Sequence, residues 1–157
     1  MPALQTDYNT YLPIAYEGAR ANLEQWNSIS RTVETAVGIG FGKVVVQGAG
    51  DHGCILPDAT HTAFLGITVR DQAADAYNPG ASVQYAPNLY LQNRTAGIMT
   101  FGCIYVVASV QVAVGDPAFF VPATGLITNV STNNIAIPRS RFDTSATANT
   151  LAILRIS

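Results

Sequence analysis

Hydrophobic and polar residues alternate with the period of a β-strand over most of the chain after residue 37. In residues 38–47, Ile39, Phe41 and Val45 fall on one face at a period of two. The glycines between them suggest close backbone approach or a bulge on the other face. Turn residues separate this segment from later strand-like runs at 63–70, 88–93, 97–107, 109–114, 118–122 and 151–157. In the run 75–85, Pro79-Gly80 form a turn that is followed by the start of a strand.

This pattern predicts an all-β fold. The run 126–138 indicates a hairpin with Ser131–Asn134 as its polar tip, and the closing run 151–157 is apolar on both faces and therefore predicted to be buried. Short strands separated by turns about every 8–12 residues, with almost no helical periodicity, are typical of sandwiches and barrels. We expect a single small β-barrel or jelly-roll-like sandwich over residues 38–157, with no internal repeat and no linker.

The first 37 residues follow no sustained period and predict an extended N-terminal arm. Four aromatic residues stand in this segment: Tyr8, Tyr11, Tyr16 and Trp26. A short helix is possible around residues 19–26, although two turns are marginal unless another surface packs on them. The arm is either a docking segment whose four aromatics form a candidate interface, or a segment folded back over its own domain.

Composition adds a reason to expect interfaces. Charged residues make up only 11% of the chain and hydrophobic residues 48%, whereas soluble domains carry about 25% charged residues. Because interface cores are depleted in charge, this deficit predicts that other subunits cover much of the surface. The most apolar run, 98–114, is interrupted by polar residues and lacks the length of a spanning helix. The N-terminus has no signal-peptide pattern, so we expect no membrane association.

The charge balance argues against nucleic acid as a partner. The net charge is −2, and Lys43 is the one lysine beside seven arginines. No basic cluster is present to track phosphates. A preference for arginine over lysine is typical of protein interfaces, although any single arginine can equally be a solvated residue. On this ground Arg139 and Arg141 are candidate interface residues.

Residues 48–53, GAGDHG, match the G-x-G-x-x-G pattern of dinucleotide-binding loops, and Asp71 follows at the spacing of a ribose-binding acid. That motif needs a helix directly after the loop. Here Pro57 interrupts the only ten residues that precede the next strand, so no helix fits. We therefore predict a surface loop without a nucleotide cofactor. Asp51 and His52 would face solvent or a neighbouring subunit, and Asp71 would be a strand-end residue.

Other candidate chemistry is weak. His52, Cys54, Asp58 and His61 could each bind zinc, but their spacing matches no closed zinc pattern. Cys54 and His52 lack an orienting acid for a nucleophilic dyad, and no G-x-S-x-G elbow is present. Cys54 and Cys103, the two cysteines, are expected as buried thiols. We predict no catalysis, no metal and no cofactor.

The order of several short motifs resembles the capsid cement (decoration) proteins of tailed bacteriophages over about residues 38–157. The matching positions are Gly40-Phe41-Gly42, Gly66–Arg70, Tyr77 with Pro79-Gly80, Val112 with Gly115–Pro117, Thr124-Gly125, and Arg141–Ala146 before the final apolar strand. Each motif alone is common, whereas their shared order and spacing are more specific. Residues 1–37 and the GAGDHG loop lie outside the resemblance.

This resemblance implies a structural virion protein without enzymatic activity or cofactor. It would lie on the outer surface of the phage head, form a dimer or trimer, and bind the major capsid protein. Its role would be to stabilise the capsid lattice against the pressure of packaged DNA. The alternative is a head or tail appendage that binds a receptor or glycan.

Overall fold

Residues 15–71 and 88–157 are described by the computed structural model, and they form eleven β-strands and no helix. The all-β prediction is therefore confirmed, and no helix in these two ranges is available to cross a membrane. The whole of the predicted run 75–85 lies outside the described residues. In chain order the strands are β1 (Asn27–Val33), β2 (Ile39–Gly40), β3 (Val44–Gln47), β4 (Gly53–Ile55), β5 (Phe64–Thr68), β6 (Leu89–Tyr90), β7 (Thr95–Ala108), β8 (Pro117–Phe120), β9 (Ile127–Thr128), β10 (Ile135–Phe142) and β11 (Thr150–Ile156).

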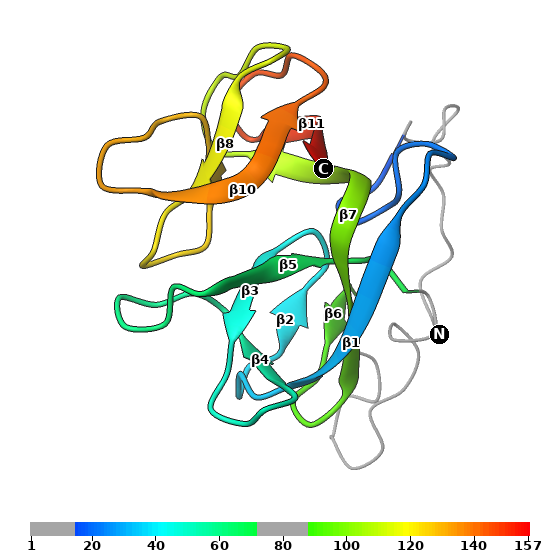
Figure 1. Ribbon diagram of the computed structural model, residues 1–157, viewed down its shortest axis with the longest axis vertical. Helices are drawn as coiled ribbons and strands as arrows, with labels where there is room; N and C mark the ends of the chain where they lie inside the picture. Colours follow the sequence, from blue (N-terminus) through cyan, green and yellow to red (C-terminus); the bar gives the residue numbers. More distant parts are fainter. Residues whose placement is uncertain (1–14, 72–87) are drawn as a thin grey trace, which may run out of the picture.

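The long strand β7 is shared by two closed circuits of strands (Figure 1). The lower barrel runs through β1, β4, β3, β5 and β7, and β7 pairs back to β1. The upper barrel runs through β7, β11, β10, β8 and β9, and β9 returns to β7 at the pair Ala108–Ile127. Strands β2 and β6 form a separate two-stranded sheet. Of the two architectures predicted, barrel and sandwich, the strands therefore form closed barrels.

Strand β7 changes partners at Phe101 and Gly102, where one barrel gives way to the other. Phe101 pairs with Asn27 of β1, and Gly102 pairs with Ile156 of β11. Gly102 has a φ of 122°, and a Cβ atom there would lie 2.8 Å from the Cβ of Trp26. Only glycine combines this backbone conformation with so close an approach. The crossing of the two barrels therefore depends on a glycine.

Two buried clusters fill the barrels, and one of them joins the barrels together. Alternate residues of β3 enter opposite clusters. Val45 packs with Ile39 and Phe41 in the lower barrel, as the period of two predicts, whereas Val44 and Val46 enter the other cluster. That other cluster also contains side chains of the upper barrel, among them Phe120, Phe142 and Leu154. Because one cluster draws on both barrels, they share a hydrophobic core.

The short helix considered around residues 19–26 does not form, and that prediction is wrong. This segment instead contains a bridge from Arg20 to Ile104 of β7, followed by bends. Its backbone groups bond to a distant strand, which offers more partners than an isolated two-turn helix could. Strand β1 also lies within the predicted arm, so sheet pairing begins before residue 38.

Two further details of the strand prediction are wrong. Residues 126–138 do not form a hairpin ladder, because β8 lies between β9 and β10 in the sheet. The predicted tip is a turn, with Asn134 N–H donating to Ser131 O at 3.2 Å, but it links strands that are not neighbours. The run 109–114 forms no strand and contributes a single bridge from Val112 to Ala146. The alternation of side chains along one strand does not determine which other strand it pairs with in the sheet.

Candidate functional site

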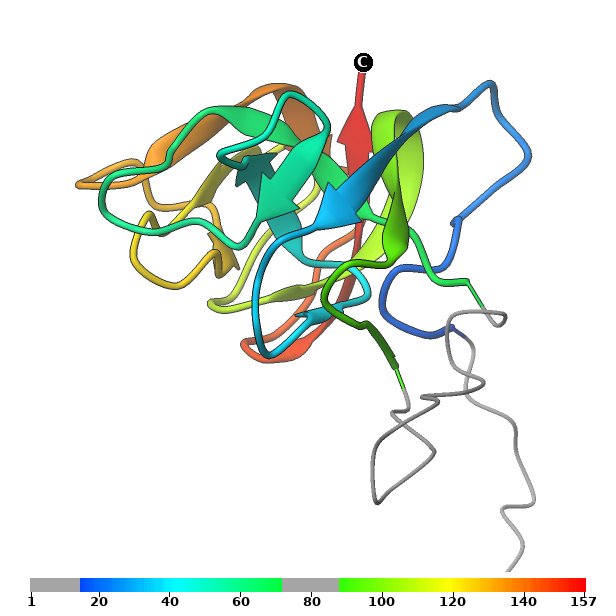
Figure 2. The ribbon, with the colours of Figure 1, turned by 90° about the horizontal axis from the view of Figure 1, so that it is seen from below.

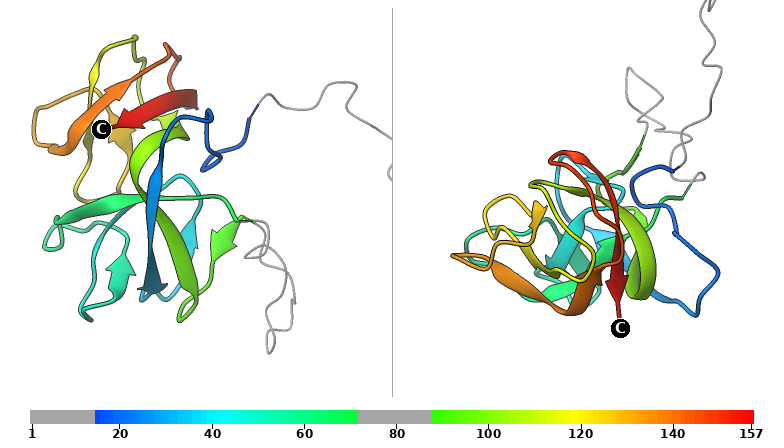
Figure 3. Two further views of the ribbon diagram at one scale, coloured as in Figure 1. Left: turned by 45° about the vertical axis from the view of Figure 1, so that its right-hand side comes forward. Right: turned by 90° about the horizontal axis from the view of Figure 1, so that it is seen from above.

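The loop Ala19–Trp26, which we call the hook, projects from the side of β7 (Figures 2 and 3). At its start, Tyr105 N–H donates to Ala19 O and Ala21 N–H donates to Cys103 O, both at 2.9 Å. Its other end continues into β1, which pairs with the first half of β7. Because both ends are fixed to one strand, the hook is held as a defined protrusion.

A group of ion pairs fixes the middle of the hook to the C-terminal strand. Arg155 of β11 holds both carboxylate oxygens of Glu24, with Nη1 at 2.6 Å from Oε2 and Nη2 at 3.0 Å from Oε1. The same guanidinium donates from Nε to Asp143 Oδ2 at 2.6 Å, and Arg141 Nε lies 3.2 Å from Asp143 Oδ1. Surface ion pairs contribute most to the stability of the fold when the arginine is bidentate and the charges form a network, as they do here.

These contacts determine the protonation states around the hook. Hydrogen bonds from Arg155 lower the pKa of Glu24. Burial alone would raise the pKa of Asp143, but the hydrogen bonds from Arg155 and Arg141 outweigh it and lower that pKa. The Cys103 thiol donates weakly to both carboxylates, at 3.7 and 3.8 Å, and burial raises its pKa. At neutral pH the carboxylates are therefore charged and the thiol is neutral.

Acid is expected to weaken this anchor. The pKa values of Glu24 and Asp143 are lower in the folded chain than in the unfolded chain. Their contribution to stability is therefore complete above about pH 4 and is lost as the pH falls through the lowered folded values. We expect the Glu24→Gln variant to melt below the wild type at neutral pH, by a modest margin because Glu24 is half-exposed.

Thermal unfolding of both proteins, from neutral to strongly acidic pH, checks this expectation. Asp58 and Asp116 also have lowered pKa values, through hydrogen bonds from Thr60 and from the backbone of Ala113 respectively. Both proteins will therefore lose stability in acid, and only the difference between their melting temperatures reports on Glu24. The two curves should converge at acid pH. A difference in melting temperature that stays constant with pH would contradict a stabilising ion pair between Glu24 and Arg155.

Large apolar side chains on and beside the hook are exposed. Leu23, in the middle of the hook, is 101% exposed, and Trp26 at its end is partly exposed. Phe101, paired with Asn27 at the start of β1, is 40% exposed. The Arg20 guanidinium carbon lies 4.4 Å from the centroid of the Trp26 ring, a cation–π contact that orients the indole. This region therefore offers a preformed apolar surface to a partner.

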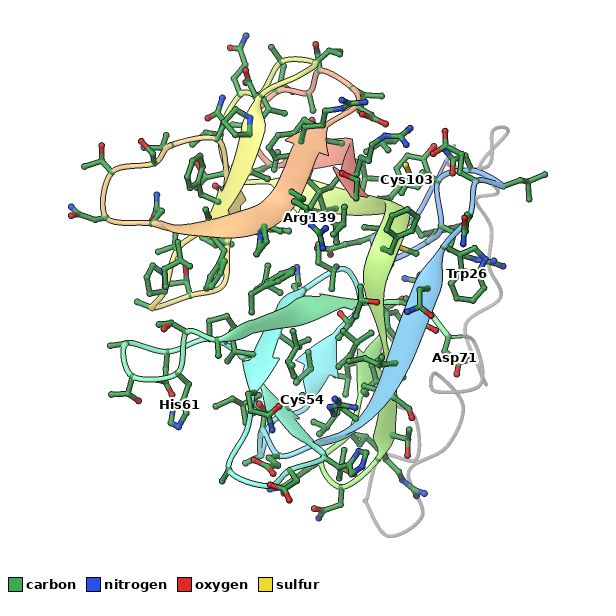
Figure 4. The ribbon with its side chains drawn as sticks, viewed as in Figure 1. Trp26, Cys54, His61, Asp71, Cys103 and Arg139 are labelled. Carbon is green, nitrogen blue, oxygen red and sulfur yellow. The ribbon has the colours of Figure 1, made fainter. Side chains whose placement is uncertain are left out.

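Two of the four predicted arm aromatics lie outside the described residues, namely Tyr8 and Tyr11. Tyr16 is exposed beneath the guanidinium of Arg70, 5.1 Å from the ring centroid. Tyr16 and Trp26 thus both lie at the root of the hook, and their role as contacts stays a prediction. Asp71, next to Arg70, is exposed beyond the end of β5, and Figure 4 shows it on the hook side of the lower barrel.

A second set of exposed apolar residues lies on the upper barrel. Val114 is 66% exposed and Val130 is 46% exposed, in the loops 109–116 and 129–134, which we call the upper loops. One carboxylate holds the two loops together, because Asp116 Oδ2 accepts from Ala113 N–H at 2.9 Å and from Asn129 Nδ2 at 2.7 Å. In Figure 1 the upper loops lie at the top and left of the upper barrel, whereas the hook lies at its right. No feature of the sequence separated these two surfaces in advance.

The G-x-G-x-x-G motif is the hairpin turn between β3 and β4. The carboxylate of Glu34 accepts from Ala49 N–H at 2.8 Å and from Gly50 N–H at 2.9 Å. A Cβ atom on Gly48 or Gly53 would collide with this carboxylate. The two glycines therefore leave the space that the Glu34 side chain occupies. Strand β4, and no helix, follows the last glycine. The amides that a dinucleotide-binding loop offers to phosphate are bound here by the chain's own glutamate.

The four predicted loop contacts are not gathered into one site. Asp51 and His52 are exposed in the β3–β4 turn of the lower barrel, and Arg139 and Arg141 are exposed on β10 of the upper barrel. Arg139 adopts a φ of 49°, and its carbonyl accepts the N–H and the hydroxyl of Ser157, both at 3.0 Å. Figure 4 shows Arg139 between the two barrels. A contact role for these residues stays a prediction.

The residues considered as zinc ligands point to different environments. Cys54 is fully buried in the lower barrel, where burial first and Glu34 second raise the pKa of its thiol to about 11. His61 lies on the protruding loop before β5, with Nδ1 at 2.9 Å from Asp58 Oδ2 (Figure 4). Within residues 15–71 and 88–157, no three histidine, cysteine or acidic side chains are placed to share a metal ion.

The described residues thus form two barrels with a common core, an anchored protrusion and two exposed apolar surfaces. Residues 4–157 match the family of phage structural cement proteins (E217 gp24/Pam3 gp6), and the chain therefore belongs to this family. The resemblance inferred from the sequence is confirmed. The match also includes most of the first 37 residues, which the motifs did not reach.

A solved structure shows the same fold. A chain from a structure titled "The capsid of Myoviridae Phage XM1" matches with a TM-score of 0.73 and 17% identity, covering 99% of this chain and 98% of that chain. The head fiber gp8.5 N base of bacteriophage phi29 gives a TM-score of 0.47 and 12% identity, covering 85% of this chain and 95% of that chain. No curated protein matches the sequence. The chain is thus a structural phage protein of the cement class.

Proposed function

We propose that this protein binds the outer surface of a phage head and stabilises the lattice of the major capsid protein against the pressure of packaged DNA. The family and the fold support a place in the capsid. The observation that carries the proposal is the presence of exposed apolar residues on two sides of the upper barrel, in the hook and in the upper loops. A molecule that bridges neighbours needs contact surfaces on more than one side.

The physical basis of stabilisation is preferential binding. A protein that binds the assembled lattice, and not its separated subunits, shifts the equilibrium toward the lattice by mass action. Many copies that each bridge two neighbours add avidity to modest individual contacts. Rigid presentation lowers the entropy lost on binding, and both surfaces are held rigidly, the hook by Arg155 and the upper loops by Asp116. The low charge content suits such contacts.

A structural role also fits the state of the two thiols. Cys54 and Cys103 are buried, and burial raises the pKa of each. A thiol held in its neutral form is a poor nucleophile. We infer that both cysteines serve in packing and that the chain has no catalytic role. We further infer that its partners are the major capsid protein and other copies of itself, and that it lies on the outer surface of the virion.

Co-sedimentation with heads that lack this protein tests the proposal. The purified wild-type chain is expected to bind such heads saturably. The double variant Val114→Asp/Val130→Asp should bind at least about tenfold more weakly, because each substitution places a charge where an apolar contact would be buried. Val37→Asp is the matched control. Val37 is 80% exposed but lies in the turn after β1, at the opposite end of the molecule.

Three outcomes would contradict the proposal. Heads that do not retain the wild-type chain would exclude capsid binding. Equal binding to heads by the wild type, the double variant and Val37→Asp would show that the upper loops do not contact the capsid. Binding to host-cell glycans without binding to heads would favour the receptor-binding appendage instead. Circular dichroism of each variant establishes that the substitutions leave the β-fold intact.

A further inference from the structure

We propose that a small hollow beside β1 is a binding site for a tetrahedral oxyanion, with inorganic phosphate as the ligand. The hollow has a volume of about 120 Å³ and lies where β1 meets the turn before β4. Its lining residues are Ser30, Arg31, Thr32, His52 and Thr95. The ligand would join three segments of the lower barrel, namely β1, the β3–β4 turn and β7. This inference concerns the folded chain itself and does not depend on binding to heads.

The register of the strands brings the neutral donors of the hollow together. Ser30 and Thr32 are exposed and lie on the same face of β1, two residues apart. Thr32 pairs with Thr95 of β7, and residues directly opposite in an antiparallel pair have Cβ atoms about 4.5–5.5 Å apart. The Thr32 N–H donates to His52 O at 2.8 Å, which holds the β3–β4 turn against β1. Three hydroxyls and an imidazole are therefore gathered from three segments that are distant in the sequence.

Arg31 supplies the positive charge, and its guanidinium is incompletely bonded. Its Nη1 donates to Ser30 O at 2.9 Å. Its Nε is buried without a hydrogen-bond partner, the one such side-chain nitrogen or oxygen within residues 15–71 and 88–157. In the same two ranges no carboxylate forms an ion pair with Arg31. A buried charged donor without an acceptor is costly. An oxyanion in the hollow, reached by a small rotation of the guanidinium, would supply that acceptor.

Two acids stand close to these residues in the sequence, but neither fills the hollow. Glu34 follows Arg31 by three residues, and its two carboxylate oxygens accept N–H groups of the β3–β4 turn. Asp51 precedes His52 in that turn and is not a lining residue. Among the described residues, then, no carboxylate lines the hollow. A negatively charged ligand there would meet hydrogen-bond donors from each of the three segments.

The size and the donors of the hollow select the ligand. Its volume is well below the roughly 300–1,000 Å³ of pockets for drug-sized ligands, so a small ion is the ligand that fits. Every lining side chain can donate, through a guanidinium, an imidazole N–H or a hydroxyl. A carboxylate directs its two oxygens to one side, whereas phosphate directs four oxygens outward in all directions. Phosphate therefore matches donors that converge from three segments, and arginine binds it through charge-assisted hydrogen bonds.

A bound phosphate would strengthen the seam at which the lower barrel closes. Strand β1 pairs with β7 along most of its length, but it meets β4 at the pairs Thr32–Gly53 and Val33–Cys54. A ligand that is bonded to β1, to β7 and to the turn before β4 adds contacts at this seam. Because such a ligand binds the folded barrel and not the unfolded chain, phosphate is expected to raise the melting temperature of the protein as its concentration rises.

Isothermal titration calorimetry of the full chain with sodium phosphate, at constant pH and ionic strength, tests this proposal. The wild type is expected to bind phosphate at one site with a Kd below about 1 mM. Arg31→Gln should weaken binding at least about tenfold, because charge-assisted hydrogen bonds are lost. Thr95→Val removes one hydroxyl, suits a strand, and should weaken binding about three- to tenfold. Arg94→Gln is the matched control. It removes the same charge from the residue next to Thr95, does not line the hollow, and should bind phosphate like the wild type.

Titration with sodium acetate separates a tetrahedral oxyanion from a carboxylate, and acetate is expected to bind at least about tenfold more weakly. The proposal is overturned if phosphate shows no saturable binding at millimolar concentrations, or if Arg31→Gln and Thr95→Val bind it like the wild type. It is also overturned if Arg94→Gln weakens binding as much as Arg31→Gln does, since the attraction would then be general to positive charge. Acetate that binds as tightly as phosphate would overturn the choice of a tetrahedral ligand.

Discussion

Replacing Phe142 with alanine is expected to lower the free energy of unfolding by about 3–5 kcal/mol, the usual cost of truncating a buried phenylalanine. Phe142 is fully buried at the end of β10, in the cluster that joins the two barrels. Its loss leaves a cavity that the surrounding strands cannot close, since they are tied into two closed circuits. Urea unfolding followed by tryptophan fluorescence and circular dichroism measures the change.

Phe101→Ala is the control for this prediction. Phe101 is 40% exposed on the outer face of β7, so its truncation should cost about 1 kcal/mol or less. Because Val44, Val46 and Ile67 of the lower barrel share the cluster with Phe142, both barrels should unfold in one transition. Two resolved transitions, or equal losses for the two variants, would contradict a common core.

The local pattern of the sequence predicted individual strands better than it predicted their partners. Ile39, Phe41 and Val45 enter one cluster because side chains alternate along an extended backbone, which is a local property. The hairpin expected at 126–138 fails for a non-local reason, since β8 occupies the edge that β9 would have offered to β10. The sharing of β7 by two barrels likewise depends on pairings far apart in the chain.

The candidate site is the part of the structure that the sequence predicts least well. The hook exists because residues 19–21 bond to β7 and because Glu24 meets Arg155, 131 positions along the chain. Neither contact has a local signature, so the local pattern predicts a possible short helix in their place. The GAGDHG loop shows the opposite case. Pro57 predicts that no helix follows the loop, and β4 confirms this, but only the structure reveals that Glu34 is the acid the glycines accommodate.

Stabilisation of heads is the second large effect that we expect. Phage heads saturated with the wild-type protein should withstand more heat before releasing DNA than bare heads from the same preparation. At a free concentration of 100 times Kd, each occupied site adds about 2.7 kcal/mol to the stability of the lattice. Summed over many sites on a closed shell, even a small contribution per site should produce a clear shift. Heads incubated with Val114→Asp/Val130→Asp at the same concentration are the matched control.

The temperature of DNA release from decorated and bare heads, measured in parallel, tests the central claim most directly. The proposed function predicts a higher release temperature for decorated heads, which rises with occupancy and is raised less by the upper-loop double variant at the same concentration. Equal release temperatures for saturated and bare heads would contradict it, because the protein would then bind the lattice without stabilising it.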